Sequence, residues 1–412
     1  MIQQIDPVVI VSFTRTPIGN LLGVLKDFSA SQLGAQAIQA AISKAGLDVS
    51  QLDAVIMGCV LQAGQGQAPA RQAAMRAGLP VTTPCTTINK MCGSGMQSVI
   101  YAHDAIAAGS LDSIIAGGME SMTNAPYLLS KARQGYRLGA GELLDHLMVD
   151  GLEDAYEAKR PMGYFAERCA EKYGLTREAQ DQFAMRSFER AKEATLNKLF
   201  SDEIVPLVLK TKQGEQMIDK DEHPFSVDPA RIPTLSPIFK TSTSSNGASP
   251  SPIGGGGAPT VTAGNSSSIA DGAAALVLMR QSAAQKLGIT PIARIVGHQV
   301  TARAPSEFTI APIDAIQKLL EKIQWTIQDV ALFEINEAFA VVTLVTMQTL
   351  KIPIEKVNIH GGACALGHPI GASGARILVT LLAALKQNHL KRGIASLCIG
   401  GGEASAVAVE MV

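Results

Sequence analysis

Long apolar runs are missing from this sequence of 412 residues, because none approaches the roughly 20 residues that a helix needs to cross a bilayer. The stretch MIQQIDPVVIVSFTRTP at the start has neither the basic region nor the apolar segment of a signal peptide. Neither sign of charge is in excess: the formal net charge is −1, which gives no signature of nucleic-acid or anionic-membrane binding. We therefore expect a cytoplasmic protein without nucleic-acid or membrane partners.

Cysteine is also scarce, and its positions exclude two kinds of site. No two cysteines form a CxxC pair, so we expect neither a zinc site nor a disulfide framework, and reduced thiols are the simpler interpretation. The six residues are Cys59, Cys85, Cys92, Cys169, Cys364 and Cys398. Apolar residues make up 47% of the chain, which suits a globular protein, and the length predicts two or three packed units.

Both ends of the chain alternate strand-like and helix-like patterns. Near the start, strand patterns lie at 8–13, 54–58 and 113–118, and helical patterns at 30–45 and 95–108. Near the end, strand patterns lie at 293–300, 331–336 and 395–402, and helical patterns at 312–323 and 375–387. This alternation predicts an α/β fold with parallel strands covered by helices. The last of these helices is apolar nearly all round, so we expect it to be buried.

The two ends also resemble each other without gaps. Residues 37–57 align with 315–335, with four identities and matching apolar positions. CGSGMQSV (92–99) aligns with GASGARIL (371–378), and IIAGGME and LCIGGGE follow in the same order. Three matches in one order predict an internal duplication.

The middle of the chain differs in composition. Residues 126–254 are richer in charge, and the Ser- and Gly-rich stretch 241–257 is typical of a mobile surface loop. Strand character then returns at 271–279. We predict an N-terminal half of residues 1–125 plus 259–285, an inserted loop domain of residues 126–258, and a C-terminal half of residues 286–412.

The stretch NKMCGSG (89–95) places Cys92 where a buried helix is expected to begin. The positive end of a helix stabilises a thiolate and lowers the pKa of the thiol. Gly93 and Gly95 would let a substrate approach closely and would leave N–H groups to bind an oxyanion. Cys92 is therefore a candidate nucleophile, and the alternative is an inert core cysteine, as most buried cysteines are.

A nucleophilic cysteine needs a base, and His368 is the best placed of the seven histidines. It lies in HGGACALGHPIGASGAR (360–376), a glycine-rich loop that aims an imidazole at the start of the second buried helix. Because that helix duplicates the one after Cys92, a pseudo-twofold pair would bring Cys92 and His368 to one site. His103, on an apolar helix face, is instead expected to be a hydrogen-bonded core residue.

Three more residues converge on the same ends of strands. Cys398 ends a predicted strand beside the glycines of CIGGG, and Asn336 and Glu337 lie at the end of the strand pattern at 331–336. Asn336 and Glu337 could hold a water or orient His368. Structural interpretations stay open for both: Asn336 could be a helix N-cap, and Glu337 a favourable charge in a first helical turn.

These motifs, in this order, resemble the thiolase family almost from end to end. The matching stretches are RTPIG (15–19), NKMCGSG (89–95), GGMESM (117–122), VTAGNSS (261–267), NEAF (336–339), GGACALGHPIGASGAR (361–376) and CIGGG (398–402). The resemblance implies a five-layered αβαβα sandwich made of two βαβαβαββ halves, with a loop domain inserted in the first. The duplication seen in the sequence agrees with that fold.

The resemblance implies a catalytic cycle with two cysteines. Cys92 would attack an acyl-CoA thioester and become acylated, with His368 assisting proton transfer. Cys398 would then take a proton from the α-carbon of a second acyl-CoA, whose carbanion attacks the acyl group. One oxyanion pocket would use His368 with a water held by Asn336, and the other the N–H groups of Cys92 and Gly400. CoA and acyl-CoA are substrates here, and no cofactor or metal is implied.

The resemblance also implies contacts with CoA. Ser267 would hydrogen-bond the pantetheine arm, and Ala338 and Phe339 would line the same tunnel. Met162 would cover the acyl pocket, and Ala263 would belong to the same binding region.

The sequence departs from the family pattern near these contacts. Pro161 stands where biosynthetic members often have histidine, and an arginine for the nucleotide end of CoA would fall near Phe225 and is missing. Segment 241–258 is longer than usual, and Ala404 replaces a common glycine.

The implied activity is reversible condensation of two acetyl-CoA molecules to acetoacetyl-CoA and CoA, because GGMESMTNAPYLL and DGLEDAY resemble the acetyl-CoA acetyltransferase branch. The alternatives are a longer-chain 3-ketoacyl-CoA thiolase of fatty-acid β-oxidation, a decarboxylating condensing enzyme and a non-catalytic acyl-CoA binder. Cys398 argues against the decarboxylating enzymes, which use one cysteine. Family members assemble as dimers or tetramers, so we expect a homodimer or homotetramer.

Overall fold

The computed structural model describes residues 6–157, 159–212, 214–238 and 258–412. The predicted loop at 241–257 lies outside these residues. The N-terminal half consists of β1 (Val8–Arg15), β2 (Gly19–Asn20), α1 (Ala30–Ala45), β3 (Ala54–Gly58), α2 (Pro69–Arg76), β4 (Cys85–Ile88), α3 (Ser94–Ala107), β5 (Ser113–Ser121), β10 (Ala270–Arg280) and α7 (Gln281–Lys286). The C-terminal half consists of β11 (Ala293–Ala302), α8 (Ala311–Ile323), β12 (Leu332–Ile335), α9 (Ala340–Leu350), α10 (Ala363–Leu366), α11 (Ile370–Gln387), β13 (Arg392–Ile399) and β14 (Glu403–Met411).

The duplication is visible in the order of the strands. Within the described residues, the strands of both halves form one sheet in the order β12-β13-β14-β11-β1-β10-β5-β3-β4, with β2 on β10. The first strands of the halves, β1 and β11, meet at its centre through two residue pairs, Val9–Arg294 and Ile10–Ala293. Outward from this seam the order is the same on both sides: first strand, last strand, next-to-last strand, second strand. The predicted α/β duplication is confirmed.

The two halves differ in one strand. In the N-terminal half β4 pairs with β3 over four residues, whereas the equivalent chain in the C-terminal half makes one bridge, Phe333 to Val357. The expected βαβαβαββ pattern is therefore complete only in the first half.

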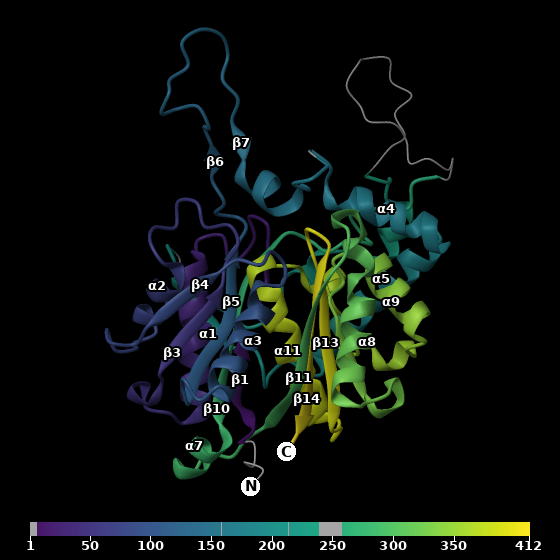
Figure 1. The fold of residues 1–412 in the computed structure, drawn as a ribbon. Coiled ribbons are helices and arrows are strands. Elements are labelled where there is room, and N and C mark those ends of the chain that lie inside the picture. Colours follow the sequence, from purple (N-terminus) through teal and green to yellow (C-terminus); the bar gives the residue numbers. More distant parts are fainter. Residues whose placement is uncertain (1–5, 158, 213, 239–257) are drawn as a thin grey trace.

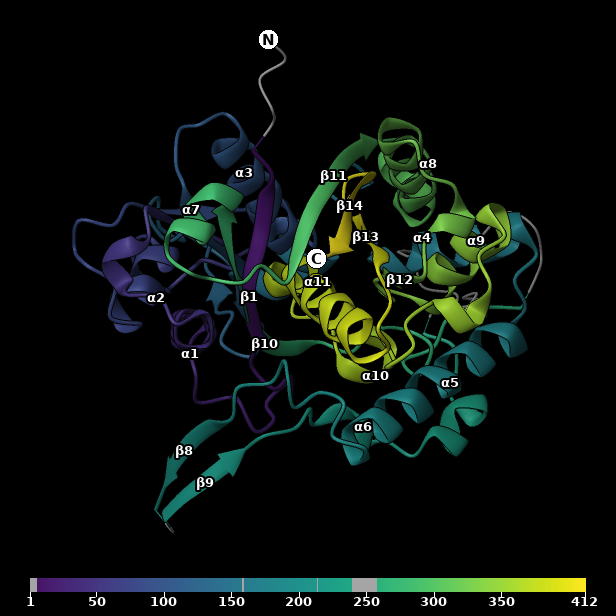
Figure 2. The ribbon, with the colours of Figure 1, turned by 90° about the horizontal axis from the view of Figure 1, so that it is seen from below.

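Helices cover the sheet in layers, as Figures 1 and 2 show. Helices α3 and α11 lie in the middle, and their apolar side chains pack between the strands of the two halves. Helices α1 and α2 cover the outer face of the N-terminal half, and α8 and α9 that of the C-terminal half. The result is the predicted five-layered αβαβα sandwich. Residues 370–385 of α11 are all buried, as its apolar pattern predicted.

Glycines let the two central helices cross closely. A Cβ at Gly95 would lie 2.8 Å from the backbone nitrogen of Ala375, and a Cβ at Gly374 would lie 2.4 Å from that of Met96. Each helix therefore needs a residue without a side chain at the crossing. This contact explains the Ser-Gly that the two halves share, and it brings the starts of both helices together.

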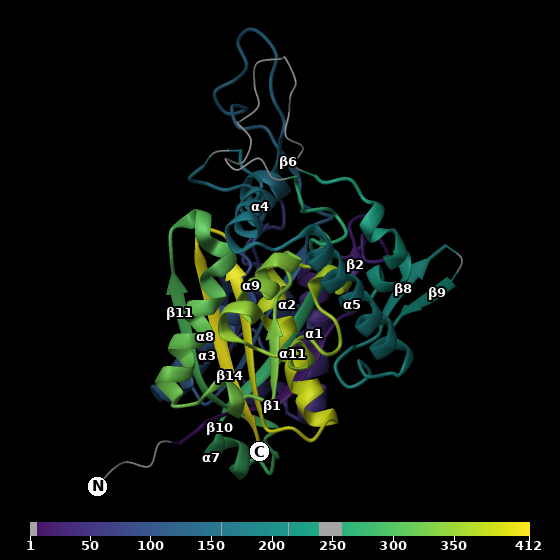
Figure 3. The same ribbon diagram turned by 90° about the vertical axis from the view of Figure 1, so that its right-hand side faces the viewer.

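The inserted segment packs mainly on the C-terminal half. It consists of β6 (Tyr127–Leu128), β7 (Leu144–Asp145), α4 (Met162–Tyr173), α5 (Arg177–Leu196), β8 (Leu207–Thr211), β9 (Gly214–Ile218) and α6 (His223–Ser226). Helices α4 and α5 contact α9, and the β8–β9 hairpin extends away from the sandwich in Figure 3. The chain between β6 and β7 reaches above the body of the molecule in Figure 1. The exact division into three units stays a prediction.

Candidate active site

A cavity of about 190 Å³ opens where the central helices begin and the strands of both halves end. Eight of the ten predicted site residues line it: Cys92, Met162, Ser267, Ala338, Phe339, His368, Cys398 and Gly400. They come from both halves and from the inserted segment. The expected meeting of Cys92, Cys398 and His368 in one cavity is thus present in the structure, and the role of each residue stays a prediction.

The turn that carries Cys92 is held by side chains of its own motif. The Lys90 N–H donates to Ser94 Oγ at 2.8 Å, and this hydroxyl donates to the Met91 carbonyl at 2.7 Å. Asn89 Oδ1 accepts from the Met91 N–H at 3.0 Å, while Met91 has a left-handed φ of 47°. These bonds hold Cys92 at the cavity surface two residues before α3.

The glycines beside Cys92 make room for the second half of the molecule, whereas the sequence suggested that their N–H groups bind an oxyanion. The Gly93 N–H donates to the Lys90 carbonyl at 3.0 Å, so it is not free to bind an oxyanion. A Cβ at Gly93 would lie 2.4 Å from Ile399 Cδ1. Gly93 therefore makes room for the end of β13, and Gly95 for α11, so both bring the second half close to Cys92.

Cys398 and Gly400 arrive on the end of β13. Cys398 is buried, and burial together with the neighbouring Cys92 raises the pKa of its thiol well above the ordinary value. Burial also raises the pKa of Cys92 to about 11, while the N–H groups of Gly400 and of Cys92 itself lower it by donating to the sulfur. The Gly400 N–H therefore points to the Cys92 sulfur, where it would stabilise a thiolate, and the role of Gly400 in an oxyanion pocket stays a prediction.

His368 reaches the cavity just before α11. Its Nδ1 lies 2.6 Å from Ser373 Oγ, and its Nε2 is buried and makes no hydrogen bond within the described part of the chain. Burial, aided by the positive charge of Arg376, lowers the pKa of His368 to about 3, so the imidazole is neutral at pH 7. A neutral imidazole with one nitrogen held by a hydroxyl can use the other nitrogen as a base.

Ser373 can serve either tautomer of this imidazole. When its hydroxyl donates to the Pro369 carbonyl, 3.0 Å away, it accepts from Nδ1–H and leaves Nε2 unprotonated. When the hydroxyl turns to Nδ1, Nε2 carries the hydrogen and can donate to an oxyanion. One residue can therefore take part in both proton acceptance and oxyanion binding.

Asn336 is buried and is not among the described residues that line the cavity, and its side-chain amide makes no hydrogen bond with the described residues. Helix α9 begins at Ala340 with Phe339 as its N-cap, so the interpretation of Asn336 as an N-cap is wrong. The interpretation of Glu337 as a charge in a first helical turn is wrong for the same reason. A buried amide without a partner is costly unless it binds something, which suits the expected water.

Glu337 is instead a buried anchor for the loop before His368. Its carboxylate accepts from the hydroxyl of Ser187 at 2.7 Å, the side chain of Asn358 at 2.8 Å and the Cys364 N–H at 3.1 Å. These bonds tie the inserted segment to the glycine-rich stretch at 360–376. Glu337 therefore holds this stretch in place and does not line the cavity.

Glu120, which sequence reasoning left out of the site, connects three of its segments. Its carboxylate accepts from the N–H groups of Val60, Leu61 and Gly371 at 2.9, 3.2 and 2.9 Å. Burial raises the pKa of Glu120 to about 7, although these hydrogen bonds oppose the shift. Its position in the motif GGMESM was the available signal.

The turn that carries Ser267 is fastened to the strand end that carries Ala338. The N–H and the hydroxyl of Ser267 both donate to the Ala338 carbonyl, at 3.0 and 2.9 Å. Asn265 closes the same turn by accepting from the Thr262 N–H at 2.8 Å. Ser267 and Ala338 are therefore held as one wall of the cavity.

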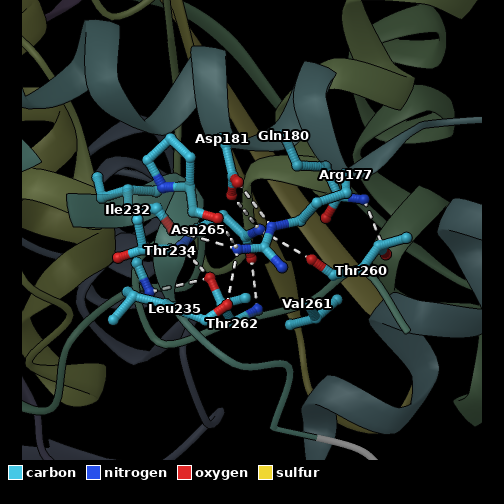
Figure 4. A network of polar contacts seen from close by, with 12 residues as sticks. Arg177, Gln180, Asp181, Ile232, Thr234, Leu235, Thr260, Val261, Thr262 and Asn265 are labelled. Carbon is cyan, nitrogen blue, oxygen red and sulfur yellow. Dashed lines mark hydrogen bonds and ion pairs between the residues drawn. The ribbon is translucent and has the colours of Figure 1, made fainter. Parts of the chain in front are cut away.

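A polar network behind this wall joins it to the inserted segment, as Figure 4 shows. Asn265 Nδ2 donates to Asp181 of α5 at 2.9 Å, and Arg177 Nε donates to the same carboxylate at 2.6 Å. Arg177 Nη2 also donates to the carbonyls of Ile232 and Leu235, at 3.1 and 2.9 Å. Arg177 thus holds residues 232–235, which lead to Ile238 on the cavity rim.

Two residues expected near CoA, Ala263 and Phe225, are not among the described residues that line the cavity. Ala263 is exposed. Phe225 is 42% exposed, and Lys220 lies 4.9 Å from the centre of its ring. Sequence reasoning missed Met148, Ile238 and Phe308, which also line the cavity. Ile238 lies in an irregular segment, and Met148 and Phe308 lie in a π-helix and a 3-10 helix that are too short for a pattern of apolar residues to show which side chains face inward.

In the described part of the chain, no helix combines the length and apolar character that spanning a membrane requires.

Known proteins similar to this chain share one family. The family model described as "Thiolase, N-terminal domain" matches residues 8–282, and the one described as "Thiolase, C-terminal domain" matches residues 289–411. The mitochondrial acetyl-CoA acetyltransferase of Rattus norvegicus is 45% identical over 407 residues, which cover 98% of this chain and 91% of that protein. Acetyl-CoA acetyltransferase 1 of Arabidopsis thaliana is 47% identical, covering 98% of this chain and 94% of that protein.

A solved structure extends the similarity to the whole fold. The crystal structure of Acat5 thiolase from Ascaris suum in complex with coenzyme A matches with a TM-score of 0.90 and 38% identity. The match covers 98% of this chain and all of that chain.

Proposed function

The chain belongs to the thiolase family, and from that premise we propose that it is an acetyl-CoA acetyltransferase. It joins two acetyl-CoA molecules into acetoacetyl-CoA and free CoA, and it runs in reverse as a thiolysis. The observation that carries this proposal is the shared cavity of Cys92, Cys398 and His368, with the Gly400 N–H aimed at the Cys92 sulfur. Relatives of acetyl-CoA acetyltransferase type, 45–47% identical, favour the acetyl substrate over longer chains.

The first half of the cycle transfers an acetyl group to the enzyme. His368 Nε2 accepts the proton of Cys92, and the sulfur attacks the thioester carbonyl of acetyl-CoA. The bond between the carbonyl carbon and the CoA sulfur breaks, and the departing CoA thiolate takes a proton from Cys398. The products are acetyl-Cys92, free CoA, a Cys398 thiolate and a protonated His368.

The second half forms the carbon–carbon bond. The Cys398 thiolate takes a proton from the α-carbon of a second acetyl-CoA, and burial makes this thiolate a strong base. The enolate attacks the acetyl carbon on Cys92, acetoacetyl-CoA leaves, and the Cys92 sulfur recovers its proton from His368. Asn336 with a bound water, together with His368, stabilises the enolate oxygen, and the Gly400 and Cys92 N–H groups stabilise the tetrahedral oxyanion; each such donor contributes roughly 3–4 kcal/mol.

Replacement of each cysteine tests this division of labour. With radiolabelled acetyl-CoA, the wild-type protein should acquire about one acetyl group per chain, and Cys92→Ser should acquire none at neutral pH. Cys398→Ala should still become labelled, because a CoA thiolate can leave and take its proton from water, but it should form no acetoacetyl-CoA. Loss of labelling in Cys398→Ala would show that Cys92 cannot be acylated without Cys398, which contradicts this division of labour, and labelling of Cys92→Ser would place the acyl group elsewhere.

The length of the acyl chain separates the two activities within the family. We expect faster thiolysis of acetoacetyl-CoA than of 3-ketohexadecanoyl-CoA, because the cavity is small and Met148, Met162 and Phe308 are among the side chains that line it. Faster turnover of the long substrate would instead identify a longer-chain 3-ketoacyl-CoA thiolase. A non-catalytic binder would turn over neither.

Assembly and location remain proposals: assembly follows from the family resemblance, and location from the balanced charge and short apolar runs of the sequence. We propose a homodimer or homotetramer in the cytoplasm that uses CoA and acyl-CoA as substrates without a cofactor. Light scattering of the purified chain would measure the assembly, and fractionation of cells would measure the location.

A further inference from the structure

Three side chains far from the reaction cavity gather their ligand atoms at one point. His103 and Asp104 lie near the end of α3, and His298 lies on β11 of the other half. Asp104 Oδ1 is 3.0 Å from His103 Nδ1 and 2.8 Å from His298 Nε2. The two imidazole rings meet edge to face, with centres 4.9 Å apart. His103 was expected in the core, but it is half-buried at the surface.

The chemistry of this group suits a transition metal. Among the described residues, these three form the one group of at least three His, Cys, Asp or Glu side chains that could hold a metal ion. Their ligand atoms all lie within 4.8 Å of one another. Two imidazole nitrogens and one carboxylate oxygen form a common three-ligand set for Zn²⁺, which keeps a water in its fourth position. The Asp104 side chain is 54% exposed, against 19% for His103 and 15% for His298, so one side of the group is open to solvent.

We propose that His103, Asp104 and His298 bind a zinc ion that joins the two halves of the sandwich. Zinc–nitrogen bonds of about 2.0–2.1 Å place two ligand atoms of a tetrahedral site roughly 3.3 Å apart. The contacts of 2.8 and 3.0 Å therefore need to lengthen by about half an ångström or less, and the two imidazole nitrogens, which lie within 4.8 Å of each other, need to reach the same separation. In the absence of metal, the same atoms hydrogen-bond through the two imidazole N–H groups; to bind Zn²⁺, each imidazole would stay neutral and carry its hydrogen on the other ring nitrogen.

The charges around the group are compatible with a cation. Burial lowers the pKa of His298, so its imidazole is neutral and can donate an electron pair. Burial alone would raise the pKa of Asp104, but hydrogen bonds from the two histidines oppose this effect and lower it, so its carboxylate is ionised. Lys322 is the nearby cation that opposes binding, and its ammonium is occupied by the His298 carbonyl at 3.1 Å.

The site is distinct from the catalytic centre. His103 lies 11 residues after Cys92, which corresponds to roughly 15 Å along a helix. The metal would therefore not take part in the condensation. The expectation of no metal came from the spacing of cysteines, which carries no information about a site built from histidines on separate elements.

Titration of the purified metal-free protein with Zn²⁺ and Co²⁺ tests the proposal. We expect one Zn²⁺ per chain by calorimetry, and a Co²⁺ visible spectrum without a sulfur-to-cobalt band. His298→Gln, His103→Gln and Asp104→Asn should each weaken binding by at least the 10- to 100-fold that loss of an outer-shell partner costs. His389→Gln, which changes an exposed histidine, should bind as the wild type does.

A second measurement asks whether the ion joins the halves. Zinc at 100 times its dissociation constant should lower the ratio of unfolded to folded protein about 100-fold, and this effect should disappear in His298→Gln. Thiolysis by the variants should stay at the wild-type rate, which shows that they fold. A sulfur-to-cobalt band that persists in His298→Gln would place the metal on cysteines and overturn the proposal, as would zinc affinity that is equal in all four variants. Absence of binding by the wild-type protein would overturn it as well.

Discussion

Replacing Arg177 by Met should loosen the rim of the cavity while leaving the reacting groups in place. Arg177 holds Asp181 at 2.6 Å and the carbonyls of Ile232 and Leu235, so it joins the rim segment to α5. Met keeps much of the length of the side chain but donates no hydrogen bond. The Asp181 carboxylate would then keep Asn265 as its remaining side-chain partner in Figure 4.

The size of the effect follows from burial. Removing one partner of a buried ion pair costs about 3–5 kcal/mol. The Arg177 side chain is 20% exposed and that of Asp181 only 4%, so we take the lower end, about 3 kcal/mol. Because about 1.4 kcal/mol corresponds to a factor of ten, local opening of the rim should become roughly 100-fold more frequent.

Two measurements check this expectation. Hydrogen exchange should accelerate by about 100-fold in residues 229–238 while α11 stays protected. The KM for CoA in thiolysis should rise several-fold, because a smaller fraction of the protein has the binding-competent rim, while kcat stays within about twofold. Adding Asp181→Leu should restore part of the protection, since it removes the unpaired carboxylate.

Arg168→Met is the matched control. Arg168 lies on α4, and its ion pair with Glu157 is 3.5 Å long between side chains that are 46% and 43% exposed. Such a surface pair contributes about 0–1 kcal/mol, so neither exchange nor KM should change. The reasoning would be refuted if Arg177→Met left exchange at 229–238 unchanged, or if it lowered kcat without raising KM.

Two other predictions concern the meeting of the central helices and the state of the nucleophile. Gly374→Ala should destabilise the protein by about 1–3 kcal/mol in urea unfolding, because its Cβ would lie 2.4 Å from the Met96 nitrogen; an unchanged midpoint would contradict this close crossing. Alkylation of Cys92 by iodoacetamide should accelerate about tenfold per pH unit between pH 7 and 10, because burial raises its pKa to about 11 and the thiolate fraction grows until that pH. A rate independent of pH over this range would instead indicate a thiolate already formed at pH 7.

Much of the fold could be predicted because the signals that mark its helices and strands, namely caps and the spacing of apolar residues, lie within each element. Helix α1 has the predicted bounds, since the capping box of Ser29 begins it and Gly46, with a φ of 66°, ends it. The apolar surface of α11 predicted its burial, and the repeated order of motifs predicted the duplication. In these cases the physical cause lies within one helix or one strand, so the sequence shows it directly.

Residues whose surroundings come from elsewhere in the chain were harder to interpret. Asn336 and Glu337 look like the start of a helix, but α9 begins later; both side chains are buried, and Glu337 accepts hydrogen bonds from Ser187, Asn358 and Cys364. Gly93 looks like an oxyanion donor, but its N–H closes a turn, and its missing side chain admits Ile399. Several of these contacts join residues that are more than 20 positions apart in the sequence. The spacing of neighbouring residues cannot predict such contacts.

The amino-acid sequence by itself determined the duplicated α/β architecture and the identity of the candidate reacting groups, Cys92, His368 and Cys398. Backbone propensity, apolar period and motif order act over a few residues, so they can be read along the chain. Only the tertiary structure decided which groups share a cavity, how burial shifts their pKa values, and where His103 and His298 meet. Those properties depend on distances through space, which arise when α3 and α11 cross and the two halves of the sheet join.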